Sequence, residues 1–186
     1  MQIPEALVDA LRRSEPGAFD EFVHAAHPVV YTLAYRITGN AEDAKDVTQE
    51  VFVRAWRGLK NFRGDANLGT WLHRITVNCA LTAVRRRSRT PIPTSDELLP
   101  DMAVEAADPG DREVLEAALR TLSDQDRIAV VLKDVEGWSC EEIARKLGTT
   151  EGAVKVRLFR ARQRLADRLA AQGVVVPMKR RSRPDG

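Results

Sequence analysis

Flat rings, positive charges and one amide side chain are grouped in the stretch FRGDANLGTWLHRITVN, residues 62–78. Bases of single-stranded nucleic acid stack on aromatic rings, their phosphates attract arginine, and an amide can pair with an exposed base edge. Asn78 lies inside a helical pattern, where an amide is a poor helix former and needs a separate reason. The stretch therefore predicts a contact with single-stranded nucleic acid. The alternative is that Phe62 and Trp71 pack in a core, which is the favoured interpretation for Trp71, and that Asn78 caps a turn. The residues concerned are Phe62, Arg63, Trp71, His73, Arg74 and Asn78.

Positive charge is concentrated in two separate parts of the chain. Residues 61–89 carry six basic and one acidic side chain, and residues 145–186 carry twelve and three. Residues 90–126 carry two basic and ten acidic side chains. The net charge of +2 therefore conceals an alternation of basic and acidic segments along the chain. Two basic blocks predict two contacts with a polyanion, with solvated helix faces as the alternative. The arginines that end the first block suit backbone phosphates, which supply affinity without sequence choice. They are Arg85, Arg86, Arg87 and Arg89.

The elements that must position the second basic block are a short helix, a turn and a longer helix. Ser139, with Glu142 three residues later, forms a capping box, which predicts the start of a helix. Gly148 favours a tight turn, and either threonine that follows it can cap a helix over residues 151–170. A short helix, a glycine turn and a longer basic helix are typical of a helix-turn-helix that reads duplex DNA.

A helical wheel at about 100° per residue separates two faces of that longer helix. One narrow arc is apolar and predicts a buried seam. The opposite arc mixes cations with two apolar side chains. In a major groove, cations serve guanine edges and phosphates, and apolar groups serve thymine methyls or sugars. Packing of Phe159 on the tail or on the other domain is the alternative. The seam comprises Val154, Leu158, Ala161, Leu165 and Leu169. The opposite arc comprises Lys155, Val156, Phe159, Arg160 and Gln163, flanked by Arg157, Arg162 and Arg164.

Hydrophobic periodicity is helical along the rest of the chain, and no stretch alternates as a β-strand does. The 186 residues are 44% apolar and 30% charged, which suffices for two small cores. The prolines and acidic side chains near the middle predict a linker. The expected fold is therefore all-α with two small helical domains. It comprises a helical bundle over residues 1–89, a flexible acidic linker over 90–110, a helix-turn-helix domain over 111–172 and a basic tail over 173–186.

Capping residues and glycines divide the two domains into helices. Gly39 is a natural helix stop, and Asn40 can cap the helix that follows. Ser123 can cap a helix that continues through Val135. We expect helices over residues 4–13, up to 38, 41–60 and 68–87 in the first domain, and over 111–120, up to 135, after 139 and over 151–170 in the second.

Three motifs, in their order along the chain, resemble conserved regions 2 and 4 of extracytoplasmic-function (ECF, group IV) bacterial sigma factors. They are DAKDVTQEVFVRAW (43–56), FRGDANLGTWLHRITVN (62–78) and GWSCEEIARKLGTTEGAVKVRLFRARQRL (137–165). The resemblance covers about residues 19–89 and 111–169. It implies a promoter-specificity subunit that is not an enzyme, without catalytic residues, cofactor, metal or small-molecule substrate.

The resemblance also implies roles for single residues. The first motif resembles the surface that docks on the clamp helices of the largest RNA polymerase subunit, with Phe52 and Trp56 as packing residues. The second resembles the part that captures a flipped base of the melted −10 element. The implied polymerase contacts are Asp43, Asp46, Gln49, Glu50 and Arg54. The implied −10 contacts are Arg63, Trp71, Arg74, Asn78, Arg85 and Arg86. The implied −35 contacts are Lys133, Thr150, Lys155, Val156, Arg157, Phe159, Arg160 and Arg162.

The sequence departs from the family at two of these positions. Members often carry arginine where this chain has Lys155, and a small polar residue where it has Val156. Lysine cannot form the forked pair that arginine makes with guanine, and valine cannot donate a hydrogen bond, so we expect a promoter preference of its own. The implied partners are core RNA polymerase (clamp helices and flap), promoter DNA, and an anti-sigma factor, which in this family is often membrane-bound.

Two other functions fit parts of the sequence. A transcriptional regulator could use the same helix-turn-helix without polymerase, although the first domain offers neither a βα pattern nor a heptad seam. A metal-dependent enzyme could use His24, His27 and His73, although no HExxH motif or paired carboxylates accompany them. Cys79 and Cys140 form no CxxC pair and predict reduced thiols, with a redox role left open. Without a signal pattern or an apolar run of membrane length, the chain is expected in the cytoplasm.

Overall fold

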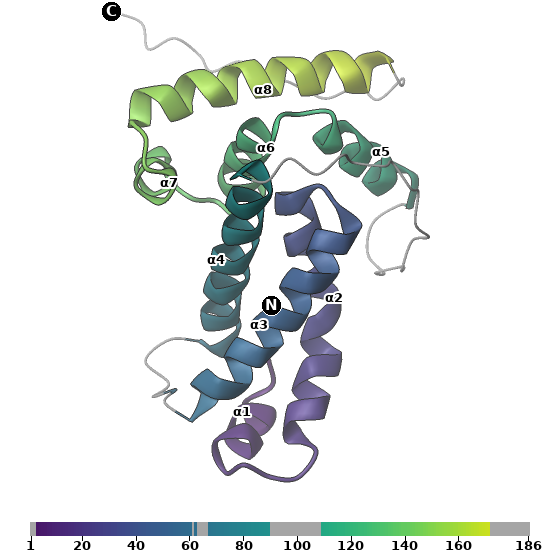
Figure 1. The fold of residues 1–186 in the computed structure, drawn as a ribbon. Helices are drawn as coiled ribbons and strands as arrows, with labels where there is room; N and C mark the ends of the chain where they lie inside the picture. The colour runs from purple at the N-terminus through teal and green to yellow at the C-terminus, as the bar shows by residue number, and fades with distance from the viewer. Residues whose placement is uncertain (1–2, 61, 63–66, 90–108, 172–186) are drawn as a thin grey trace, which may run out of the picture. The chain divides into compact units, whose positions relative to one another are not determined.

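The computed structural model describes residues 3–60, 62, 67–89 and 109–171, and every regular element in these ranges is helical (Figure 1). The chain divides into two compact units, Met1–Glu105 and Ala106–Gly186. The predicted all-α fold with two helical domains is thus confirmed. The predicted linker and tail lie outside the described residues, except that a helix already begins at Pro109. No helix in the described ranges combines the length and apolar character needed to cross a bilayer.

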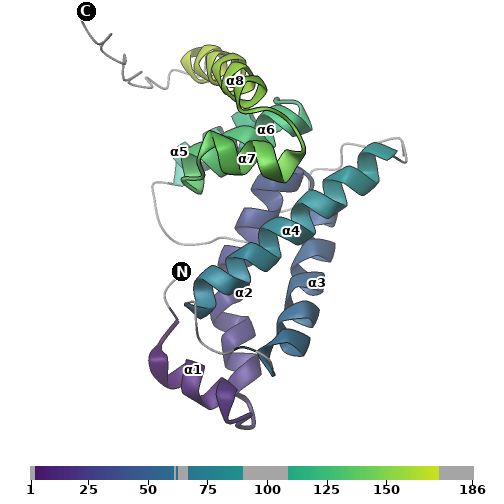
Figure 2. The same cartoon turned by 90° about the vertical axis from the view of Figure 1, so that its left-hand side faces the viewer.

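In the described part of the first unit, one short helix accompanies three long ones that lie side by side (Figures 1 and 2). The short helix α1 (Glu5–Arg12) packs against α2. The long helices are α2 (Ala18–Thr38), α3 (Ala41–Leu59) and α4 (Leu68–Arg89), and each packs on the other two. Burial of one large apolar side chain stabilises the fold by about 1.5–3 kcal/mol. Fully buried examples are Phe22, Ile37, Val51, Leu72 and Val77.

Local signals place the ends of these helices within two residues of the predicted positions. Gly39 ends α2 with a φ of 66°, in the left-handed region that glycine adopts readily. Asn40 then caps α3, because its Oδ1 accepts a hydrogen bond from the backbone nitrogen of Asp43 at 2.9 Å. The start of α3, and with it the position of its polar face, therefore follows from the Gly39–Asn40 pair.

The second unit contains the predicted helix-turn-helix. Ser123 caps α6, accepting from the nitrogen of Asp126 at 3.3 Å. The helix runs through Val135 as predicted, but its last five residues form a π-helical turn, which a wheel with a fixed angle cannot foresee. Helices α5, α6 and α7 pack on α8, and Figure 2 shows α7 and α8 joined by a short connection. The elements are α5 (Pro109–Arg120), α6 (Asp124–Val130), the π-helical turn η1 (Val131–Val135), α7 (Cys140–Leu147) and α8 (Glu151–Ala171).

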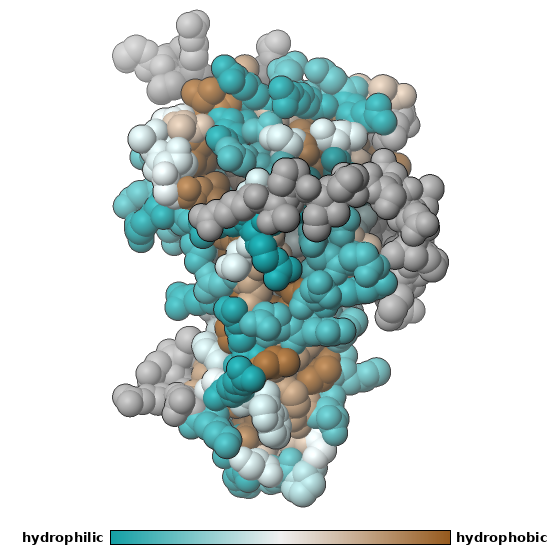
Figure 3. Space-filling model, in the orientation of Figure 1, coloured by the Kyte–Doolittle hydropathy of each residue, from teal (hydrophilic) through white to brown (hydrophobic). Residues whose placement is uncertain are grey.

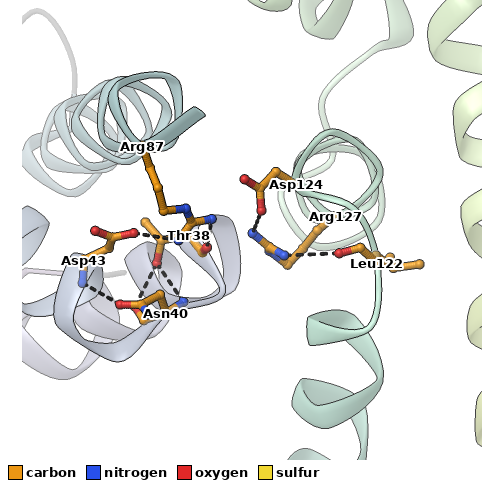
Figure 4. Close-up of polar contacts among 7 residues, drawn as sticks. All are labelled: Thr38, Asn40, Asp43, Arg87, Leu122, Asp124 and Arg127. Atoms are coloured by element: carbon orange, nitrogen blue, oxygen red, sulfur yellow. Dashed lines mark hydrogen bonds and ion pairs between the residues drawn. The ribbon is translucent and has the colours of Figure 1, made fainter. Parts of the chain in front are cut away.

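A buried arginine ties α6 to the turn before it. Arg127 is only 4% exposed. Its Nη2 lies 2.6 Å from Oδ1 of Asp124, and its Nη1 donates to the carbonyl of Leu122 at 3.3 Å (Figure 4). A buried charge is costly unless it is paired and hydrogen-bonded, so partners such as these allow an arginine in this core. The predicted core did not include this residue.

Candidate functional site

The outer side of α3 presents four of the predicted polymerase contacts. Asp46, Gln49, Glu50 and Arg54 are all exposed, whereas Val47, Val51 and Phe52 between them are buried. Oε1 of Glu50 lies 2.6 Å from Nε of Arg54, one turn further along. The hydrogen bond with Glu50 raises the pKa of Arg54. We call the surface formed by these four residues the α3 face.

Asp43, the fifth predicted contact, is engaged within the fold. Its Oδ2 lies 2.6 Å from Nη1 of Arg87 on α4, and Nη2 of Arg87 donates to the carbonyl of Thr38 at 3.1 Å (Figure 4). The two charged side chains are 27% (Arg87) and 23% (Asp43) exposed. The hydroxyl of Thr38, which is fully buried, donates to the carbonyl of Asn40. These bonds join the end of α4 to the α2–α3 junction, so Arg87 points into the fold, whereas Arg85 and Arg86 are exposed.

Two apolar side chains near the α3 face are exposed. Val53 is 44% exposed, and Trp56 is 56% exposed with its ring edge-on to Phe19, the ring centroids 4.7 Å apart. Phe52 is buried as predicted, but Trp56, which was also assigned to packing, is mostly open to solvent. Figure 3 shows residues of high hydropathy, in brown, at the surface over the lower part of the first unit. Val53 lies seven residues after Asp46, on the same side of the helix as Gln49 and Glu50. This spacing could have identified Val53 from the sequence as part of the exposed side of α3.

Trp71, near the start of α4, is held between a glycine and a second ring. Its Cζ2 lies 2.7 Å from the position that a Cβ would occupy on Gly58 of α3. Its ring centroid is 5.3 Å from that of Phe62. Both rings are half-buried, so each packs against the unit and keeps part of its surface open. Arg63, which was predicted to act beside them, lies outside the described residues.

The exposed side of α4 carries the remaining predicted −10 contacts. Arg74, Asn78, Arg85 and Arg86 are all exposed. The first three recur at intervals of four and seven residues, which places them on one stripe of the helix. On this stripe an amide lies between two cations. The order suits a single strand of nucleic acid, in which a base edge would meet the amide and the phosphates on either side would meet the cations.

Cys79 lies on the buried side of α4. It is 4% exposed, and burial raises the pKa of its thiol above the ordinary value of 9.0, an effect that the nearby charge of Arg54 partly offsets. A raised pKa keeps the thiol protonated at neutral pH, and the protonated form is a poor nucleophile. Cys79 is therefore a packed thiol on the buried side of α4. Cys140, in the second unit, is half-buried.

The helix-turn-helix has the predicted caps. Oγ of Ser139 accepts from the nitrogen of Glu142 at 3.1 Å, and Oε2 of Glu142 accepts from the nitrogen of Ser139 at 2.8 Å. The hydrogen bonds from Ser139 lower the pKa of Glu142. Gly148 then turns the chain with a φ of 66°. Of the two threonines that could cap α8, Thr150 has the hydroxyl that accepts from the nitrogen of Ala153, at 3.2 Å.

Helix α8 has the two faces that the helical wheel predicts. All five seam residues are buried, with exposures between 0% and 8%. On the opposite side, Val156 is 51% exposed and Phe159 is 71% exposed, which argues against packing of Phe159 on the described residues. Lys155, Arg160 and Gln163 are also exposed. The surface expected to face DNA is thus open.

The arginines that flank this surface contact the elements beneath α8. Arg162 binds Asp134 of η1 through two guanidinium nitrogens, with its Nε 3.0 Å from Oδ2. This bond raises the pKa of Arg162. Such contacts brace α8 against α6 and η1, so the flanking arginines serve the fold whatever else they contact. The other two pairs are Arg157 with Gln125 and Arg164 with Asp126, the latter at 3.1 Å.

The two lysines predicted to contact duplex DNA differ in exposure. Lys155 is exposed and pairs with Glu151, one turn earlier, at 2.7 Å. Exposed pairs of this kind contribute little to stability, so Lys155 can exchange Glu151 for a phosphate at small cost. Lys133 is half-buried on η1, beside Asp134.

The histidines do not form a metal site in the part of the chain that the structure describes. No group of three His, Cys, Asp or Glu side chains is placed there to hold an ion. His27 instead stacks parallel to Tyr31 and Phe52, with ring centroids 6.3 Å apart in each case. The structure therefore gives no support to an enzyme built on His24, His27 and His73.

Known proteins match both units. Residues 22–90 match the family model of sigma-70 region 2, and residues 112–165 match that of sigma-70 region 4. The ECF RNA polymerase sigma factor SigE of Mycolicibacterium smegmatis is 43% identical over 164 residues, covering 82% of this chain and 62% of SigE. SigG of Mycobacterium tuberculosis is 40% identical over 74% of this chain and 46% of SigG. The chain thus spans less than two thirds of these two relatives. SigM of Mycobacterium tuberculosis is 37% identical over 88% of this chain and 83% of SigM.

Two solved structures resemble the chain. The sigma factor RpoE from Bartonella quintana, solved in complex with the anti-sigma factor NepR, is 28% identical, with a TM-score of 0.56 over 83% of this chain and 98% of RpoE. CnrH, solved in complex with the cytosolic domain of CnrY, is 26% identical, with a TM-score of 0.52 over 89% of this chain and 96% of CnrH. With sigma-70 regions 2 and 4 on its two helical units, the chain belongs to the ECF family of RNA polymerase sigma factors.

Proposed function

We propose that the chain is a promoter-specificity subunit that binds core RNA polymerase and directs initiation from a −35 duplex and a melted −10 strand. One observation carries the proposal. The models of regions 2 and 4 both match this one chain, and in each unit most of the residues with predicted contact roles lie on exposed helix faces. A subunit that acts by binding needs accessible complementary surfaces rather than a reactive group. A protein with these partners would act in the cytoplasm.

The α3 face is the proposed docking surface for the clamp helices of core polymerase. Its charged and amide side chains would set orientation and specificity, and Val53 and Trp56 would add apolar contact area. Asp43 is the exception, because its bond with Arg87 favours a role in holding α4 over a direct contact.

The exposed stripe of α4 is the proposed contact with the −10 strand. In this proposal the exposed Asn78 would read an unpaired base, and the exposed Arg74, Arg85 and Arg86 would meet phosphates. The open surface of Trp71 can stack on a base. Arg63, which lies outside the described residues, stays a predicted −10 contact.

The exposed face of α8 is the proposed reader of the −35 duplex, and Thr150 at its start and Lys133 on η1 are further proposed contacts. Recognition helices enter the major groove with their N-terminal residues on base edges. The flap of core polymerase is a further proposed partner of the second unit.

Run-off transcription with purified core polymerase over a randomised promoter library tests the proposal. We expect transcripts from a subset of templates that share two elements, and none from core polymerase alone. The absence of transcripts from every template in the library would refute the proposal. Binding to duplex DNA without co-elution with core polymerase in gel filtration would instead favour a conventional regulator.

An anti-sigma factor is the proposed regulator of the chain. RpoE from Bartonella quintana, a solved relative, was crystallised in complex with the anti-sigma factor NepR. The test is affinity capture of the full chain from its native cells, separately from membrane and soluble fractions. We expect a small protein that blocks run-off transcription when it is purified and added back. Recovery of polymerase subunits alone would contradict this.

A further inference from the structure

The first turns of α8 present an apolar strip where a recognition helix usually meets base edges. Gly152, Ala153, Val156 and Phe159 are all exposed, and the side chains of Val156 and Phe159 lie opposite the buried seam. The space around Gly152 is open, with no atom within 4 Å of the position of a Cβ. The first amide on this side of α8, Gln163, comes seven residues, about two turns, after Val156. The part of α8 expected to enter the groove first therefore has no hydrogen-bonding side chain at its centre.

Three cations beside this strip are not well placed to supply the missing hydrogen bonds to base edges. Arg157 donates to Gln125, and Arg162 is held by Asp134. Lys155 pairs with Glu151 and carries no fork for a guanine edge. Arg160 is exposed on the same side of α8, one turn after Val156, where it suits a phosphate or a guanine edge.

We propose that Val156 and Phe159 read thymine methyl groups, so that the −35 element of this protein has thymines at the neighbouring base pairs facing them. This inference rests on the proposed function. The C5-methyl of thymine is the apolar group that a base pair presents in the major groove. The side chains of valine and phenylalanine form no hydrogen bonds, so the contact they can make with a base edge there is burial of this methyl. Loss of one buried methyl weakens binding by about fourfold, from the usual value for a buried carbon group.

Replacement of thymine by deoxyuridine tests this directly, since it removes the methyl and leaves every hydrogen-bonding group in place. The probe is a fluorescent promoter duplex selected from the randomised library by the full chain bound to core polymerase. Each thymine of its −35 element, on either strand, is replaced in turn. We expect about fourfold weaker binding at one or two neighbouring positions and no change at the other thymines.

Variants of the protein show which residue causes the weaker binding of a deoxyuridine duplex. Val156→Ala or Phe159→Ala should bind the thymine and deoxyuridine duplexes almost equally at the position that each one reads. Val29→Ala is the matched control, because Val29 is a similarly exposed valine on α2 in the other unit and should keep the full discrimination.

Two results would overturn the inference while leaving the proposed function intact. One is a selected −35 element in which no deoxyuridine replacement changes the affinity. The other is full discrimination retained by both Val156→Ala and Phe159→Ala. A holoenzyme that selects no duplex and starts no transcript would instead refute the proposed function itself.

Discussion

Nη1 of Arg87, near the end of α4, lies 2.6 Å from Oδ2 of Asp43 in the first turn of α3. The contact links residues 44 positions apart and ties the helix that carries Asn78 to the helix that carries the α3 face. Asp43 and Asp46 look alike in the sequence, since both are carboxylates near the start of the same helix. The structure separates them, because Asp43 faces α4 and Asp46 faces solvent.

Asp43→Asn and Arg87→Ala should each lower the free energy of unfolding of the first unit by about 1–3 kcal/mol, the usual range for a charge-assisted hydrogen bond that loses its partner. Urea titration of the full chain measures this, and a double-mutant cycle should give effects that are clearly not additive. Asp46→Asn is the matched control. It makes the same chemical change at an exposed site, so stability should hold while affinity for core polymerase falls. Additive effects in the cycle would show that the pair does not stabilise the fold.

Gly58→Ala should displace the ring of Trp71. Alanine is the better helix former by about 1 kcal/mol, so propensity alone predicts a gain in stability. The new Cβ would meet Cζ2 of Trp71 at 2.7 Å, and overpacking of this kind costs about 1–3 kcal/mol. We expect a net loss of stability and a changed near-ultraviolet circular dichroism signal from the ring. Gly152→Ala is the control, since its Cβ would meet no atom within 4 Å and should stabilise α8. A stability gain of equal size in both variants would contradict the contact with Trp71.

Cys79 should resist thiol reagents in the folded protein. Burial raises the pKa of its thiol, so at pH 8 little of it is the reactive thiolate, and its labelling rate should rise as the pH approaches that raised pKa. Labelling with Ellman's reagent in the Cys140→Ser variant isolates this thiol, and addition of urea should release it. Rapid labelling of the folded variant at pH 8 would reopen a redox role for Cys79.

Signals that act over a few residues were enough to predict the helices and their caps. Asn40, Ser139 and Gly148 have the predicted roles because each bonds or turns within four residues of itself. The seam of α8 was predicted for the same reason, since a helix fixes the direction of every side chain. Contacts across the fold were not predicted. The partners of Arg87 and Arg162 lie 28 or more residues away, and both arginines looked like phosphate contacts in a basic run.

The salt dependence of promoter binding should separate the arginines of α8 that contact DNA from those that brace the helix. Each phosphate contact that is lost reduces the slope of log affinity against log salt by about one. Arg160 is exposed, so Arg160→Ala should weaken −35 binding and reduce the slope by about one. Arg162 is held by Asp134, so Arg162→Ala should leave the slope unchanged. Asp134→Ala releases Arg162 and should leave the slope unchanged or make it steeper. The measurement is fluorescence anisotropy of promoter DNA with holoenzyme over a range of salt concentrations. An equal reduction of the slope in Arg160→Ala and Arg162→Ala would mean that Arg162 leaves Asp134 for a phosphate when DNA binds.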